Sequence, residues 1–296
     1  MTPSGSSEPR QKWLSPLVLA AVAGLLVVGT YWSSWKYLVL SWWRQFDDYG
    51  HAFLVPVFSG YLLWKRREMV SPWPERGSLW CVPFFVLWAA IRWGAAYFNY
   101  AVDHYSLIPL LVGVALFLGG WRALHWSWSP IVFLVFMFPL PGALAGGLSQ
   151  ELQGIGTRVS VFVIQTLGVA AVSQGNIIFV QDTPVNVAEA CSGLKMLVFF
   201  FTVCVGAALV LDSPWWERVV IVLSAPPIAI LANVARITVT ALLLHLKLGE
   251  LADKFFHDMS GLVVTMPVAL IVLWVEIALL RRIFIETDTE GPLSLP

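Results

Sequence analysis

Three side chains in the last 110 residues have the types that cysteine-based acyl transfer requires: Cys191, Arg236 and His257. A thiolate attacks a carbonyl carbon, a cation or an N–H donor stabilises the resulting oxyanion, and an imidazole moves the protons. The spacing of the three along the chain does not bring them together by itself. Whether they can meet depends on the elements that carry them.

Cys191 lies in the motif Glu189-Ala190-Cys191-Ser192-Gly193, directly before an apolar run over 192–211. A cysteine at the start of a helix faces unpaired N–H groups and the positive end of the helix dipole, and both lower the pKa of a thiol. Lys195, four residues on, adds positive potential on the same face, whereas Glu189 opposes it unless it is paired. The alternative is a buried structural cysteine, which is what we expect of Cys81 and Cys204 inside apolar runs.

Arg236 follows Asn233 by three residues in an apolar run, so the two side chains share one face of the predicted helix. Lys247 marks the end of that helix, about 16 Å further on at 1.5 Å per residue. An arginine at that depth needs an anion, a set of carbonyl groups or a water-filled cavity. A structural ion pair with an acid such as Glu189 is the alternative.

His257 and Asp258 lie where the last loop enters the final apolar run. A histidine there can titrate near neutral pH and act as general acid or base. Asp258 either orients it or serves as the acid at the start of the following helix. Simple solvent contact is the competing interpretation for His257.

The composition requires a membrane protein. Of 296 residues, 58% are hydrophobic and 12% are charged, which is half of the charge of an ordinary soluble domain. The formal net charge is zero, so nucleic acid is not an expected partner. Three cysteines without a CxxC pair suggest neither a disulfide scaffold nor a zinc site, and we expect no metal and no organic cofactor.

Apolar runs predict an all-α membrane protein of about eight transmembrane helices. We expect one polytopic domain over 13–282, with cytoplasmic tails at 1–12 and 283–296. The run before Lys65 is short and relies on basic side chains that extend to the interface. The predicted spans are 13–31, 52–64, 79–97, 106–121, 127–140, 192–211, 218–246 and 259–280.

Positive charge orients this topology. With the N-terminus in the cytoplasm, ten Lys and Arg residues of the loops lie on the cytoplasmic side and five on the other side. Both termini are then cytoplasmic, and Cys191 and His257 fall on the same outer face. Arg236 points toward that face from the outer half of its helix. The three side chains therefore form a predicted acyl-transfer set.

Two segments before Cys191 do not suit a full crossing. Residues 143–172 mix polar and apolar positions, which predicts an amphipathic helix at the outer face. Two β-prone runs, Ile177–Val180 and Val185–Val187, flank Asp182-Thr183-Pro184 and predict a hairpin. An open sheet edge is not tolerated in lipid, so the hairpin must lie in water or against protein.

The motifs around Cys191, Arg236 and His257 resemble those of the exosortase/archaeosortase family of integral membrane cysteine transpeptidases. They read Glu189-Ala190-Cys191-Ser192-Gly193, Asn233-Val234-Ala235-Arg236-Ile237 and His257-Asp258-Met259-Ser260-Gly261. Further similarity lies in His51-Ala52-Phe53-Leu54-Val55-Pro56 and Phe138-Pro139-Leu140-Pro141, and the resemblance covers about residues 45–280.

The resemblance implies that Cys191 is the nucleophile and that Arg236 and His257 are catalytic. Glu189, Ser192, Gly193, Lys195, Asn233 and Asp258 are second-tier candidates for substrate contact or tuning of the thiol. It further implies exported substrates with a C-terminal signal, made of a short Pro-Glu-Pro-like motif, a transmembrane helix and a basic cluster. The acceptor is a lipid, a glycan or an amine. The expected location is the bacterial cytoplasmic membrane, with the active site on the outer face.

Three other functions remain open on the sequence. A transporter or flippase would use Arg236 and Glu189 in its substrate path. A membrane scaffold for secretion or polysaccharide machinery would need none of the three polar residues. An intramembrane protease would need Cys191 but would only hydrolyse its substrate.

Overall fold

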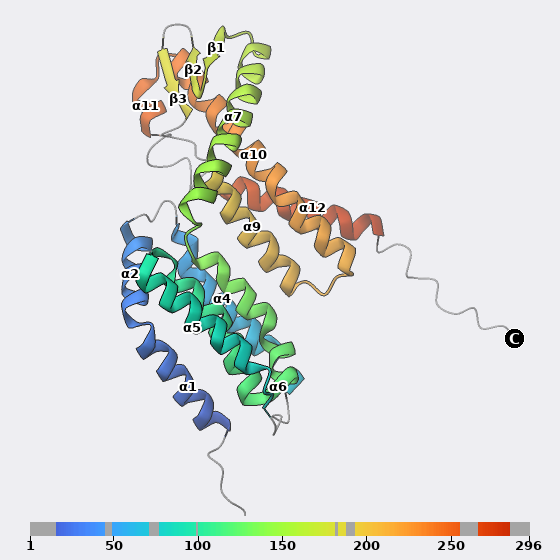
Figure 1. The fold of residues 1–296 in the computed structure, drawn as a ribbon. Helices are drawn as coiled ribbons and strands as arrows, with labels where there is room; N and C mark the ends of the chain where they lie inside the picture. Colours follow the sequence, from blue (N-terminus) through green and yellow to red (C-terminus); the bar gives the residue numbers. More distant parts are fainter. Residues whose placement is uncertain are drawn as a thin grey trace, which may run out of the picture. The chain divides into compact units, whose positions relative to one another are not determined.

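The computed structural model describes residues 16–44, 49–70, 77–98, 100–180, 183–187, 193–254 and 266–284. The chain divides into two compact units, which are described separately (Figure 1). The first unit comprises residues 1–41 and 59–138, and the second comprises residues 42–58 and 139–296.

The first unit is helical. Its α-helices are α1 (Pro16–Thr30), most of α2 (Trp32–Arg44), the second half of α4 (Leu54–Lys65), α5 (Cys81–Phe98) and α6 (Leu107–Phe133). Short 3-10 helices η2 (Arg67–Val70), η3 (Tyr100–Ser106) and η4 (Leu134–Met137) link them. The helices α5 and α6 pack closely, since a Cβ atom on Gly113 of α6 would lie 2.7 Å from the ring of Phe85 on α5.

The helix α6 contains a break at a different position from the one that we predicted. We expected two spans, 106–121 and 127–140, separated near residue 124. Helical structure instead continues through that region, and the backbone leaves the helical conformation at Gly119 and Gly120. Gly120 has φ 61° and ψ −151°, a conformation open to glycine and not to residues with a Cβ atom. The helical segment ends at Met137, three residues before the predicted end of the span 127–140, and Phe138 is extended.

Six side chains of the first unit form what we call the Asp103 network: Tyr31, Ser34, Trp88, Arg92, Asp103 and Ser106. The carboxylate of Asp103 forms an ion pair with Arg92, at 3.3 Å from Nη1, and accepts a hydrogen bond from Ser34. Arg92 also donates to the carbonyl oxygen of Thr30 at 2.8 Å.

The network continues through hydroxyl groups. Ser106 Oγ donates to the carbonyl oxygen of Asp103 at 2.6 Å and is hydrogen-bonded to the hydroxyl of Tyr31. Trp88 Nε1 donates to that hydroxyl at 2.9 Å, and the Arg92 guanidinium lies 4.7 Å from the centre of the Tyr31 ring. Each polar group therefore has a protein partner in place of the water that it loses on burial.

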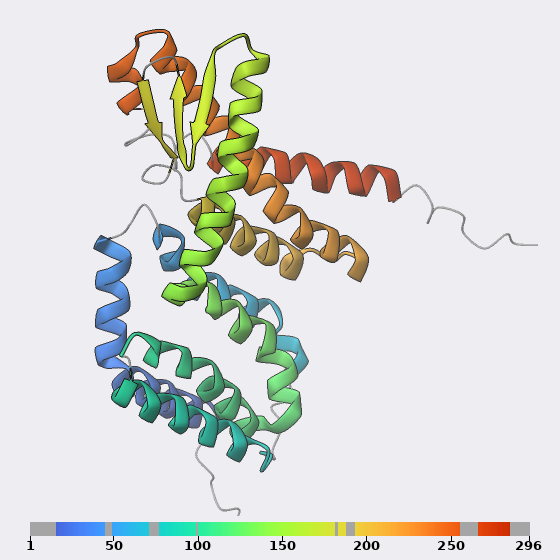
Figure 2. The ribbon, with the colours of Figure 1, turned by 45° about the horizontal axis from the view of Figure 1, so that its top comes forward.

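The second unit combines helices with a small sheet. Its long helices are α7 (Gly142–Thr166), α9 (Gly193–Val210), α10 (Trp215–His245) and α12 (Met266–Phe284), and its short ones are η1 (Gly50–Phe53) and α11 (Gly249–Lys254). Its strands are β1 (Ala171–Gln174), β2 (Ile177–Val180) and β3 (Thr183–Asn186). The helices α9 and α10 lie side by side (Figures 1 and 2), with the apolar side chains of Phe200, Cys204, Ile221 and Ala225 buried.

The sheet has one strand more than we predicted. The hairpin of β2 and β3 is confirmed, with Ile178 opposite Val185, and β1 adds a third antiparallel strand beside β2. Pro184 lies on the edge strand β3, where a missing N–H group is tolerated. The helix that we expected over 143–172 ends at Thr166, which leaves Ala171–Gln174 free to form a strand.

Gly168 ends α7 and so separates it from β1. Its φ is +85°, and the N–H of Val169 reaches back to the carbonyl oxygen of Ile164 at 3.2 Å, as in a Schellman motif. One buried apolar cluster brings together residues from both sides of this turn and Ile237 of α10. The residues around the turn and in the sheet are Ile164, Val169, Ile178 and Val185. The sheet is thereby held against α7 and α10.

The structure supports a mostly helical membrane protein. Helical segments occupy part of each of the eight predicted spans. Among the described residues, four helical segments are long and apolar enough to cross a membrane: Cys81–Phe98, Val102–Met137, Gly193–Val210 and Trp215–His245. The count of eight crossings and the orientation stay predictions.

Candidate active site

The second unit contains the described part of the predicted site. Gly193 and Lys195 lie in the first turn of α9, where Gly193 is buried and Lys195 is exposed. Asn233 and Arg236 lie on α10. Five predicted site residues fall outside the described residues: Cys191, His257, Glu189, Ser192 and Asp258.

The start of α9 matches the expectation for a helix directly after the cysteine motif. The helix begins at Gly193, and its 18 residues contain no acidic side chain in the first turn. Cys191 precedes Gly193 by two residues in the sequence and lies outside the described residues, so its place at the N-terminal end of this helix stays a prediction.

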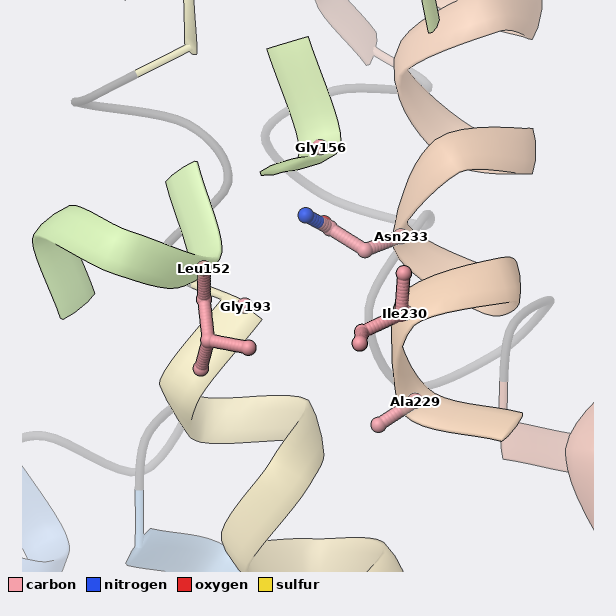
Figure 3. Close-up of a pocket in the computed structure, with 6 residues that line it drawn as sticks. All are labelled: Leu152, Gly156, Gly193, Ala229, Ile230 and Asn233. Atoms are coloured by element: carbon pink, nitrogen blue, oxygen red, sulfur yellow. The ribbon is translucent and has the colours of Figure 1, made fainter. Parts of the chain in front are cut away.

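Asn233 connects the start of α9 to α10. Its side chain is 3% exposed. A Cβ atom built on Gly193 would lie 3.3 Å from Asn233 Nδ2, and a Cβ atom built on Gly156 of α7 would lie at the same distance. Figure 3 shows the amide directed between these two glycines. Three helices thus meet at this amide, and two of them contribute a residue without a side chain.

A small pocket surrounds this meeting point, and we call it the Asn233 pocket. Apart from the amide it is lined by backbone and apolar groups (Figure 3). Its lining residues are Leu152, Gly156, Gly193, Ala229, Ile230 and Asn233.

Four buried polar groups at or near the α7–α10 interface lack a hydrogen-bond partner among the described residues. They are Asn233 Oδ1 and the hydroxyls of Thr157, Ser160 and Thr238, and we call them the unpaired set. None of the four side chains is more than 8% exposed. Other hydroxyls of this unit form ordinary bonds within a helix: Thr240 Oγ1 donates to the carbonyl oxygen of Arg236 at 3.0 Å.

Arg236 lies one helical turn beyond Asn233 and is half-buried. Residues three apart on a helix have neighbouring side chains. Because Asn233 contacts Gly193, the turn of α10 that carries Arg236 lies beside the start of α9. In the part of the chain that the structure describes, no group of three or more His, Cys, Asp or Glu side chains is arranged to hold a metal ion.

Comparison with known families identifies the chain. A model described as transmembrane exosortase matches residues 42–275. The chain belongs to the transmembrane exosortase family. No curated protein and no solved structure matches it.

Membership of the family indicates a membrane transpeptidase for sorting signals. The matched residues agree closely with the range of about 45–280 over which the motifs show the resemblance. The exosortase match includes the α7–α10 interface, the sheet and the three motifs, so the Asn233 pocket lies inside the family's common region.

The contribution of α7 to this region was not predicted from the sequence. The motifs singled out Asn233 and Gly193 but not Gly156, Thr157 or Ser160. Gly156, Thr157 and Ser160 were a signal, because small and hydroxyl residues three and four positions apart share one face of a helix and allow another helix to approach closely. Only the folded chain shows that Asn233 is the residue that approaches.

Proposed function

We propose that this exosortase is a cysteine transpeptidase that cleaves a C-terminal sorting signal of exported proteins and transfers the acyl group to an acceptor. Cys191 is the proposed nucleophile, and Arg236 and His257 are the proposed partners. One observation carries the proposal: Asn233 contacts Gly193 and so joins the helix that follows the cysteine motif to the helix turn that bears Arg236.

The first half of the reaction forms a thioester. The Cys191 thiolate attacks the scissile carbonyl carbon, and the carbonyl oxygen becomes an oxyanion. The backbone N–H groups of Ser192 and Gly193, or the Arg236 guanidinium, stabilise that charge. The C–N bond then breaks, and the leaving amine takes a proton from the imidazolium of His257.

The second half regenerates the enzyme. An amine or hydroxyl group of the acceptor attacks the thioester carbon while His257 takes its proton. The C–S bond breaks, and Cys191 leaves as a thiolate. Water in place of the acceptor would give hydrolysis, so the same site can serve a protease.

We propose that the substrate signal consists of a short motif, a transmembrane helix and a basic cluster. The acceptor is a lipid, a glycan or an amine. The enzyme resides in a bacterial cytoplasmic membrane, with both termini in the cytoplasm and the active site on the outer face. The predicted distribution of basic residues supports this orientation.

Co-expression with a reporter tests the proposal. The reporter is an exported protein with a C-terminal signal of this kind from the same genome, and its size is followed by blot. We expect processing by the wild type and a loss of roughly a thousandfold or more with Cys191→Ala and Cys191→Ser, since the nucleophile is removed or weakened.

Cys204→Ala is the matched control, because Cys204 is a free, buried cysteine in α9. It should process the reporter as the wild type does. Equal processing by Cys191→Ala and the wild type would contradict the proposal and favour a transporter or scaffold. The mass of the new C-terminus separates transfer from hydrolysis.

A further inference from the structure

The end of α4 meets the second half of α6 at a group of basic and aromatic side chains within the first unit, which we call the Arg66 corner. Arg66 is half-buried, and the other members are exposed. The proposed reaction and the Asp103 network use none of them. The members are Trp64, Lys65, Arg66, Arg67, Trp121 and Arg122.

Arg66 joins the two helices. Its guanidinium donates to the carbonyl oxygen of His125 at 2.8 Å and to the hydroxyl of Ser129, both on α6. Trp126 Nε1 adds a bond in the opposite direction, to the carbonyl oxygen of Leu63 at 3.1 Å. These hydrogen bonds fix the end of α4 against α6. Because the two α6 partners of Arg66 are neutral, its positive charge is held in place without being cancelled.

Arg67 and Arg122 add two exposed positive charges to this junction. Arg67 lies over the ring of Trp64, 4.7 Å from its centre, and donates to the carbonyl oxygen of Trp64 at 3.1 Å. Arg122 precedes Trp126 by four residues, so it shares the face of α6 that contacts α4. Among the residues that the structure describes, neither arginine forms an ion pair, and the neighbouring acid Glu68 is exposed. The corner therefore carries an excess of positive charge.

Exposed tryptophans surround these charges. Trp64 is 60% exposed, Trp80 is 63% exposed and Trp121 is 58% exposed. The rings of Trp80 and Trp121 have their centres 6.4 Å apart, and the Arg66 guanidinium lies 5.9 Å from the centre of the Trp128 ring. Exposed tryptophans on a membrane protein are typical of the headgroup level, where the ring meets lipid and the N–H meets water.

A phospholipid with an anionic headgroup matches both properties of the corner. Guanidinium groups bind phosphate through paired N–H donors, and the tryptophan rings offer apolar contact to the adjoining lipid. A soluble polyanion would leave those rings in water. The predicted topology places the connections after the spans 52–64 and 106–121 on the cytoplasmic side, where anionic lipids attract basic side chains.

We propose that the Arg66 corner is a binding site for the headgroup of an anionic phospholipid in the cytoplasmic leaflet. Arg67 and Arg122 donate to the lipid phosphate, and Arg66 holds together the two helices that carry them. The site is independent of the proposed transpeptidation, so the two proposals stand or fall separately.

Native mass spectrometry of the full-length protein in detergent tests the site with phosphatidylglycerol and phosphatidylcholine of identical acyl chains. We expect the wild type to bind phosphatidylglycerol about tenfold more tightly than phosphatidylcholine. Arg67→Gln/Arg122→Gln leaves the α6 hydrogen bonds of Arg66 in place, and its preference should fall to about twofold or less. Each single substitution should lower the preference about threefold. All three variants should melt as the wild type does in neutral detergent.

Lys36→Gln/Arg158→Gln is the matched control, since it removes the same charge from two exposed positions outside the corner. Lys36 lies 5.3 Å from the centre of the Trp32 ring, so it reproduces a cation over a tryptophan without the neighbouring arginines. This control should keep the preference of the wild type for phosphatidylglycerol.

Three results would overturn the site. The first is an unchanged preference in Arg67→Gln/Arg122→Gln. The second is an equal loss in that variant and in the control, because net charge alone would then explain the binding. The third is displacement of phosphatidylglycerol by an equal concentration of inorganic phosphate, because the ligand would then be free phosphate and not a lipid.

Discussion

Ser106 and Ser160 are both completely buried, yet one hydroxyl is bonded and the other is not. Ser106 belongs to the Asp103 network of the first unit, where it bonds Tyr31 and the main chain of residue 103. Ser160 belongs to the unpaired set, for which no partner occurs among the described residues. The first arrangement is what folding alone favours, because every buried donor finds an acceptor.

Among the described residues, no hydrogen bond offsets the cost of burying the unpaired set. Each buried group without a partner lowers stability by about 1–3 kcal/mol relative to a bonded one. Natural proteins concentrate such costs at functional sites. The contrast favours a stabilising role for the Asp103 network and leads us to propose a functional role for the neighbourhood of Asn233. Substitutions test each role.

The largest effect should come from the Asp103 network. Asp103→Leu leaves Arg92 without its ion pair and removes the acceptor of Ser34, and we expect the free energy of unfolding to fall by about 3 kcal/mol. Thermal melting of the purified protein in detergent measures the loss. The double variant Arg92→Leu/Asp103→Leu should recover part of it, since no unpaired charge remains. A melting temperature for Asp103→Leu equal to that of the wild type would refute a stabilising network.

The two buried serines give a matched pair of intermediate size. Ser106→Ala removes a hydroxyl with two partners and should cost about 1 kcal/mol, whereas Ser160→Ala removes a hydroxyl without a partner among the described residues and should be neutral or stabilising. Melting under identical conditions compares them. Equal destabilisation by both substitutions would show that the unpaired set is paired in the folded protein.

The smallest effect should appear within α10. Thr238→Val removes an unpaired hydroxyl, and Thr240→Val removes one that donates to the carbonyl oxygen of Arg236. We expect Thr238→Val to be neutral or slightly stabilising and Thr240→Val to cost about 0.5 kcal/mol. Chemical denaturation of the two variants provides the comparison, and the reverse order would remove the distinction between bonded and unpaired hydroxyls on this helix.

Sequence patterns predicted the helices and strands better than the breaks and turns between them. The β-prone runs Ile177–Val180 and Val185–Val187 predicted the hairpin, and long apolar runs predicted the helices. The strand Ala171–Gln174 was missed because it is short and weakly patterned, although Gly168 is a recognisable helix stop. The break at Gly119 and Gly120 was missed because paired glycines inside an apolar run do not determine where a helix bends.

Likewise, only part of the candidate site was predicted from local sequence patterns. Local motifs were sufficient to select Asn233 and Gly193, since each lies in a short pattern with chemical meaning. Gly156, Thr157 and Ser160 lie far upstream in the chain and gain meaning only from packing against α10. A single sequence shows that these residues are small or carry hydroxyl groups, but not which helix they face. The joint role of Cys191 and His257 stays a prediction.

Stability and processing measured on the same preparations test the central claim most directly. For Cys191→Ala the account predicts the melting temperature of the wild type and a loss of reporter processing of roughly a thousandfold. For Ser106→Ala it predicts a lower melting temperature and unchanged processing per folded enzyme. The account is contradicted if Cys191→Ala processes the reporter as the wild type does.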